Sequence, residues 1–109
     1  MLVIIIDRLI GVKMFLVDLV YKADISIVEK FTPEHRAWLD EQYKAGHFMF
    51  SGPKKPRTGG VIIAKMANRE ELEILLAEDP FAKNQVAEYH ITEFIAMKAH
   101  PELQQFVEK

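Results

Sequence analysis

The sequence predicts an α+β domain in which four strands and two helices follow one another in the order βαββαβ. Three observations support this prediction. Short apolar runs recur, amphipathic helical patterns fill the first and third intervals between them, and glycine and proline mark the turns. The strands are expected at residues 15–21, 47–51, 61–66 and 86–97. Because crossovers are right-handed, this order gives an antiparallel four-stranded sheet with both helices on one face, the ferredoxin-like arrangement.

Length and composition narrow the class of protein. The chain has 109 residues, enough for one domain with a single core. Its net charge of −2 gives no general attraction to nucleic acid or anionic membranes, so neither is expected as a partner. The absence of cysteine excludes disulfides, thiolate zinc sites and cysteine nucleophiles, and it fits a cytoplasmic location. The apolar run at residues 2–6 is too short to span a membrane.

The chain divides into three segments. Residues 1–13 precede the first predicted strand and have two interpretations: an additional edge strand, or an extension upstream of a start at Met14. Residues 14–98 form the domain proper. Residues 99–109 are a tail that we expect to be helical, because its apolar side chains have the spacing needed to dock on the domain.

The strands at 15–21, 61–66 and 86–97 carry apolar residues on both faces. The strand at 61–66 (VIIAKM) has the length and apolar character of a central strand. Two helices cover only one face of a four-stranded sheet, so a large apolar surface would remain exposed. We therefore predict a homodimer that forms through the open sheet face.

The first helical region reads as two pieces. Asp24 is expected to cap a short turn that ends near residue 31. A separate helix is expected over 33–45, since Thr32 suits the N-cap and Pro33 the first helical position. Gly46 then provides the C-terminal stop.

The second helix is predicted from Asn68 to Glu78. Asn68 and Glu71 form a near capping box at its start. The helix ends before Asp79, because a residue that precedes proline is disfavoured in helical geometry.

His35 is the first candidate for chemistry. In a helix that starts after Thr32 it occupies the third position, on the buried stripe with Trp38. The helix dipole and burial both favour a neutral imidazole there. Such a ring can act as a general base, provided that a partner fixes its tautomer. The alternative is a half-buried histidine satisfied by the backbone.

Asp79 is the second candidate. Asp-Pro pairs commonly form turns in which the carboxylate accepts from its own backbone, and this is the structural interpretation. The predicted topology, however, places the Asp79 corner in the same helical layer as His35. A carboxylate that accepts from a histidine ring fixes its tautomer and raises its basicity.

Other motifs argue against several classes of site. No histidine pair has metal-ligand spacing, so no metal site is expected. The segment GPKKPRTGG at 52–60 lacks the pattern of a phosphate loop, and its basic residues are expected to be solvated, with contact to an anionic substrate as the alternative. The strand at 61–66 lacks the aromatic residues of an RNA-binding sheet.

The segments HRAWLDEQYKAGHFMFSGP, GGVIIAKM, EDPF and EYHITEF together resemble the YCII-related (YciI-like) domain family. The resemblance covers residues 14–98 and implies a ferredoxin-like dimeric α/β barrel. It also implies a histidine–aspartate pair, which falls on His35 and Asp79. The turn at Ser51, Gly52 and Pro53 matches the small-Gly-Pro turn of the family near the same pocket.

The resemblance also implies a class of chemistry. Some relatives are associated with degradation of chlorinated aromatic compounds, including a hydroxyquinone-type dehydrochlorinase. We therefore expect a cofactor-independent lyase or isomerase acting on a small, cyclic organic substrate, with His35 as general acid/base and Asp79 orienting it. The alternative is a non-catalytic small-molecule-binding or accessory module, in which the pair only ties the helical layer together. The residues expected to contact the substrate are Trp38, Phe48, Phe50, Ser51, Gly52, Pro53 and Phe81.

Overall fold

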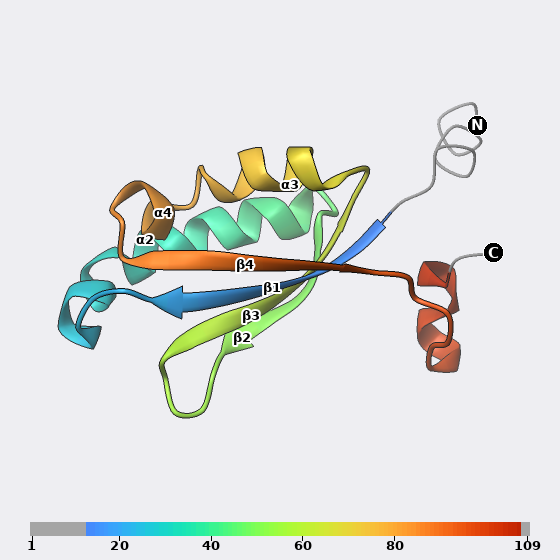
Figure 1. The fold of residues 1–109 in the computed structure, drawn as a ribbon, viewed down its shortest axis with the longest axis horizontal. Coiled ribbons are helices and arrows are strands. Elements are labelled where there is room, and N and C mark those ends of the chain that lie inside the picture. The colour runs from blue at the N-terminus through green and yellow to red at the C-terminus, as the bar shows by residue number, and fades with distance from the viewer. Residues whose placement is uncertain (1–12, 108–109) are drawn as a thin grey trace.

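The computed structural model describes residues 13–107, and its elements form one antiparallel sheet covered by helices. The strands lie in the order β2-β3-β1-β4, where β1 is Lys13–Tyr21, β2 is Phe48–Pro53, β3 is Gly59–Met66 and β4 is Ala87–Phe94. All helices that cover the sheet lie on one face (Figure 1): α2 (Ile25–Lys44), α3 (Arg69–Leu76) and α4 (Pro80–Lys83). The ferredoxin-like prediction is confirmed, with β3 in the interior of the sheet. The two interpretations of residues 1–13 fall almost wholly outside the described residues.

The core lies between the sheet and the helices and has two parts. The larger part joins β1, β2 and β3 to α3; its buried residues are Phe15, Val17, Phe48, Ile62, Ala64, Met66, Leu72 and Leu76. The smaller part joins β1 and the start of β4 to α2 and α4; its buried residues are Leu19, Val28, Phe81, Val86 and Ala87. This second part fixes α2 relative to α4, and the candidate site lies on these two helices.

Helix α2 differs from the prediction, because it is one continuous helix of 20 residues. Thr32 is therefore not an N-cap; its hydroxyl donates to the carbonyl oxygen of Val28 at 3.0 Å, and Pro33 lies inside the helix. An internal proline costs about 3 kcal/mol of helix stability. The buried side chain of Val28 anchors the first turns in the core and offsets this cost. His35 consequently lies mid-helix, where the helix dipole has little effect.

Strand β2 also departs from simple alternation. Phe48 pairs with Ala64, but Phe50 pairs with Ile63, so a register shift lies between the two phenylalanines. A bulge of this kind sends Phe48 into the core and Phe50 to the open face, where 57% of Phe50 is exposed. Ser51 then returns to the face that the helices cover.

The remaining boundaries differ by a few residues. The side chain of Asn68 accepts from the backbone N–H of Glu71 at 2.8 Å, as the near capping box predicts, and α3 ends at Leu76. The predicted connector after Pro80 contains α4. Strand β4 ends at Phe94, after which the chain leads to a 3-10 helix, η1 (Pro101–Phe106), beyond the end of the sheet (Figure 1). The ring of Phe106 lies 5.5 Å from Nζ of Lys65 in β3.

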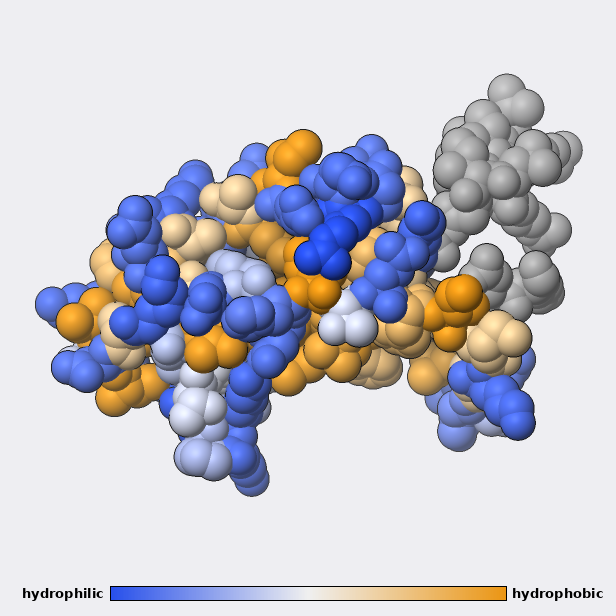
Figure 2. Space-filling model, viewed as in Figure 1, coloured by the Kyte–Doolittle hydropathy of each residue, from blue (hydrophilic) through white to orange (hydrophobic). Residues whose placement is uncertain are grey.

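The open face of the sheet is only partly apolar. The strand pairings place apolar side chains of β1, β2 and β3 there, including Leu16, Phe50 and Ile63. The same face of β4 carries Glu88, His90 and Thr92, so the expectation that β4 is apolar on both faces was wrong. Ile95 and Met97, which follow β4 in the chain, are exposed as well. Figure 2 shows orange, apolar atoms at several places on the surface, among blue, hydrophilic ones. No helix within residues 13–107 combines the length and the apolar character needed to cross a membrane.

Candidate active site

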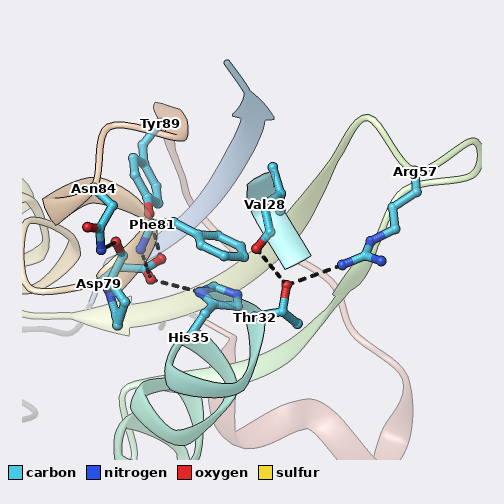
Figure 3. A network of polar contacts seen from close by, with 9 residues as sticks. Val28, Thr32, His35, Arg57, Asp79, Phe81, Asn84 and Tyr89 are labelled. Carbon is cyan, nitrogen blue, oxygen red and sulfur yellow. Dashed lines mark hydrogen bonds and ion pairs between the residues drawn. The ribbon is translucent and has the colours of Figure 1, made fainter. Parts of the chain in front are cut away.

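His35 and Asp79 lie in direct contact although 44 positions separate them in the sequence. His35 projects from the middle of α2, and Asp79 is the N-cap of α4. The ring Nδ1 of His35 lies 2.7 Å from Oδ1 of Asp79 (Figure 3). The Asp79 side chain is fully buried, and 12% of the His35 side chain is exposed. The contact predicted from the topology and the family resemblance is present.

The buried Asp79 carboxylate accepts three hydrogen bonds. Besides His35, the backbone N–H of Phe81 donates to Oδ1 at 3.0 Å, and the hydroxyl of Tyr89 donates to Oδ2 at 2.5 Å. Burial raises the pKa of Tyr89 well above its ordinary value, and the charge of Asp79 and the hydrogen bond to it add to this effect. Tyr89 therefore remains a donor at neutral pH. Both carboxylate oxygens are satisfied, so the orientation of Asp79 is fixed.

The contact with Asp79 determines which ring nitrogen of His35 is available. A carboxylate acceptor requires a proton on Nδ1, so in the neutral ring the lone pair is on Nε2. No residue in the range 13–107 hydrogen-bonds to Nε2. The ring stacks on Phe81, with centroids 4.0 Å apart and planes 7° apart, and it lies 6.1 Å from the ring of Trp38. The ring is thus held in place with its basic nitrogen free.

A cleft of about 220 Å³ lies beside His35, between α2 and one end of the sheet. Its helical wall consists of Thr32, His35, Arg36 and Leu39, whose i, i+3, i+4, i+7 spacing puts them on one stripe of α2. The opposite wall comes from β2 and β3, and Phe81 of α4 lies beside His35. The size suits a small molecule and the lining is mainly apolar.

Two adjacent glycines shape this end of the sheet. Gly60 pairs with Leu19 on the face that the helices cover, and its lack of a side chain leaves the floor of the cleft open. A Cβ on Gly59 would lie 1.9 Å from the carbonyl oxygen of Leu19, so only glycine fits there.

Arg57 reaches the cleft from the β2–β3 loop. Its guanidinium donates to the hydroxyl of Tyr21 and to Oγ1 of Thr32, both at 3.4 Å. Figure 3 shows this side chain pointing at the stripe of α2 that carries His35. Arg57 is exposed, as expected for this loop, but its guanidinium also contacts residues at the edge of the cleft.

Comparison with known proteins agrees with this architecture. The profile of the YCII-related domain matches residues 14–95. The chain belongs to the YCII-related domain family. A comparison with curated protein sequences gave no match.

Solved structures share the fold of this YCII-related domain. The 5-chloro-2-hydroxyhydroquinone dehydrochlorinase TftG from Burkholderia phenoliruptrix AC1100, in complex with 2,5-dihydroxybenzoquinone, is 17% identical, with a TM-score of 0.66 over 74% of this chain and 92% of that chain. SnoaB, a cofactor-independent oxygenase from Streptomyces nogalater, is 15% identical, with a TM-score of 0.48 over 83% of this chain and 97% of that chain. At 17% identity, the likeness to TftG establishes similarity of fold alone.

The predicted substrate contacts of this YCII-related domain divide into two groups. Those that line the cleft are Ser51, Gly52, Pro53 and Phe81, together with His35. Trp38, Phe48 and Phe50 lie elsewhere. Trp38 packs against Phe48, with ring centroids 5.5 Å apart, and Phe48 is buried in the core. Phe50 faces away because of the β2 bulge.

Sequence reasoning missed Tyr89 and Arg36, and it gave contact between the loop of Arg57 and an anionic substrate only as the alternative. The alternation of β4 places Tyr89 on the helix side, but its partner Asp79 becomes visible only in three dimensions. Arg36 follows His35 directly in the sequence. If residues 25–44 had been interpreted as one helix, the i, i+4 spacing of Thr32 and Arg36 would have placed both on the same stripe. Residues 13–107 contain no group of three or more acidic or histidine side chains placed to hold a metal ion.

Proposed function

We propose that this protein is a cofactor-independent enzyme of lyase or isomerase type, in which Nε2 of His35 is the general acid/base. The observation that carries the proposal is the 2.7 Å contact between Nδ1 of His35 and the fully buried Asp79, with the same ring lining a cleft. Asp79 orients the ring and stabilises the imidazolium that forms when Nε2 takes a proton.

The chemistry requires one proton acceptor and one place for the proton to go. Nε2 takes a proton from a substrate carbon or hydroxyl. If His35 returns the proton to another atom, the substrate is isomerised. If a leaving group departs with its electron pair and His35 releases the proton to that group or to water, the reaction is an elimination. TftG, whose name describes a dehydrochlorinase, performs a reaction of the second kind on this fold, which supports the proposed class.

The cleft favours a small, flat substrate. Its volume of about 220 Å³ accommodates a single substituted ring. Leu39, Ile62 and Phe81 provide apolar contacts, while Ser51 provides a hydroxyl. We therefore propose a cyclic, polar-substituted organic compound as substrate.

A turnover screen tests this function. Substituted hydroquinones and hydroxybenzoquinones would be incubated with the wild type and with His35→Gln, and their ultraviolet–visible spectra followed without added metal or cofactor. We expect at least one compound to be converted by the wild type and not by the variant. Equal conversion by both would contradict the role of His35, and binding without any conversion would favour the non-catalytic module.

We further propose that two copies associate through the open sheet face, which keeps Leu16 and Phe50 away from water in the dimer. Multi-angle light scattering should give twice the 12.6 kDa of one chain. Leu16→Glu should reduce this mass toward that of one chain, because it places a charge at the centre of the interface. Ile74→Glu, on the opposite side and 68% exposed, is the matched control and should remain dimeric. A single-chain mass for the wild type at micromolar concentration would contradict the dimer.

A further inference from the structure

The cleft has a charge opposite to that of the whole chain. The chain carries a net charge of −2, yet the residues that line the cleft include Arg36 and Arg57 and no aspartate or glutamate. Asp79 is buried behind His35 and does not line the cleft. A concave surface lined by one sign of charge concentrates ligands of the other sign.

The backbone of the loop that carries Arg57 is fixed, but the hydrogen bonds of the Arg57 guanidinium are long. Two backbone hydrogen bonds fix this loop. The N–H of Lys54 donates to the carbonyl oxygen of Gly59 at 2.9 Å, and the N–H of Tyr21 donates to that of Thr58 at 3.0 Å. The guanidinium contacts of Arg57 all lie at 3.4–3.5 Å, the long end of the hydrogen-bonding range. Its ion pair with Glu29 is exposed and therefore weak. The guanidinium can thus exchange these contacts for a better acceptor.

Arg36 adds a second guanidinium near the same place. Its side chain is exposed and has no ion-pair partner within the described part of the chain. It lies one helical turn from Thr32, whose Oγ1 contacts Arg57 at 3.4 Å. Both arginines therefore line the cleft close to Thr32. The ion pair with Glu29 shows that a carboxylate can reach the guanidinium of Arg57.

We propose that the cleft binds a small organic acid, with its carboxylate held by Arg57 and assisted by Arg36, and its apolar ring against Phe81 and Leu39. The planar fork of arginine matches the two oxygens of a carboxylate, and such charge-assisted pairs are stronger than neutral hydrogen bonds. The cleft's polar end and its apolar lining together fit a ligand of this kind.

This carboxylate position adds a class of substrate to the proposed function, and it rests on that function for the chemistry. Thr32 and His35 are three positions apart on one helix face, which corresponds to about 5–6 Å between their Cβ atoms. A carboxylate bound at the level of Thr32 would put atoms a few bonds away next to Nε2 of His35. The reacting position is therefore a carbon or hydroxyl on the ring that carries the carboxylate.

A titration with two matched probes tests the binding. Benzoate and its neutral isostere benzamide would be titrated into the ¹⁵N-labelled wild type, Arg57→Gln, Arg36→Gln and Lys55→Gln, at fixed ionic strength. Benzoate should bind the wild type about tenfold more tightly than benzamide does. Arg57→Gln should lose about this factor for benzoate alone, and Arg36→Gln should lose less. Lys55→Gln, an exposed residue of the same loop outside the cleft, should bind like the wild type.

Two results would overturn the inference. One is equal affinity for benzoate and benzamide; the other is an equal loss in Arg57→Gln and Lys55→Gln, which would indicate only the overall charge of the loop. The proposed function fails separately. Benzoate binding that depends on Arg57, together with turnover that is unchanged in His35→Gln, would leave the binding site standing and remove the catalytic role. Conversely, turnover of neutral compounds alone that is lost in His35→Gln would support the catalytic role and remove the carboxylate-binding site.

Discussion

His35→Gln is expected to lower kcat by about 10²–10⁴-fold on any substrate that the wild type converts. Glutamine retains a polar side chain of similar reach but cannot take up a proton at neutral pH. The lost quantity is proton transfer in the transition state, so kcat and kcat/KM should fall together while KM changes little. Steady-state kinetics on the purified variant measures both constants.

The control for this variant is His47→Gln. His47 hydrogen-bonds to Gln42 at 3.0 Å and lies outside the cleft, so its replacement should leave kcat within about twofold of the wild type. A His35 variant with a normal kcat and a raised KM would show that the ring only contributes to binding, and the proposed role would be wrong.

Asp79→Ala is expected to reduce the free energy of unfolding by about 3–5 kcal/mol. The aspartate side chain is fully buried and accepts from His35, Phe81 and Tyr89. Its removal leaves these donors without an acceptor in a largely buried region, and each such loss costs about 1–3 kcal/mol. Urea denaturation followed by circular dichroism, at one fixed protein concentration, measures the difference.

Asp24→Ala provides a matched control, because Asp24 is also a helix N-cap but its side chain makes no capping hydrogen bond. Its replacement should change stability by less than about 0.5 kcal/mol. If Asp79→Ala were as stable as Asp24→Ala, the buried network would contribute nothing measurable to stability.

Asp79→Asn preserves the volume, so a variant that folds normally but has lost turnover would separate the orienting role from the structural one.

Most of the fold was predictable because local patterns and topology agree. Apolar runs of strand length, the stop at Gly46 (φ 82°) and the cap at Asn68 all have the predicted effect. The break expected at Pro33 is absent, and burial of Val28 on the preceding turn offsets part of the local penalty of proline. The β2 bulge was not predictable, since nothing in HFMFS distinguishes a register shift from simple alternation.

The candidate site was predictable only where one residue type suggests chemistry by itself. His35 and Asp79 stood out for this reason, and the family resemblance linked them. Tyr89 and Arg57 act through contacts with residues 10 and 25 or more positions away, so no local pattern marks them. Phe50 illustrates the opposite error: an aromatic side chain beside the correct turn was expected at the cleft, and the bulge directs it to the other face.

The most direct test of the central claim is the tautomer of the His35 ring in the resting protein. Two-dimensional ¹H–¹⁵N long-range correlation NMR of the ¹⁵N-labelled wild type, with His35→Gln to assign the signal, distinguishes the two neutral tautomers. We expect a proton on Nδ1, donated to Asp79, and an unprotonated Nε2 on the ring that lines the cleft. A proton on Nε2, with Nδ1 accepting from a protonated Asp79, would contradict the proposal that Nε2 is the general base.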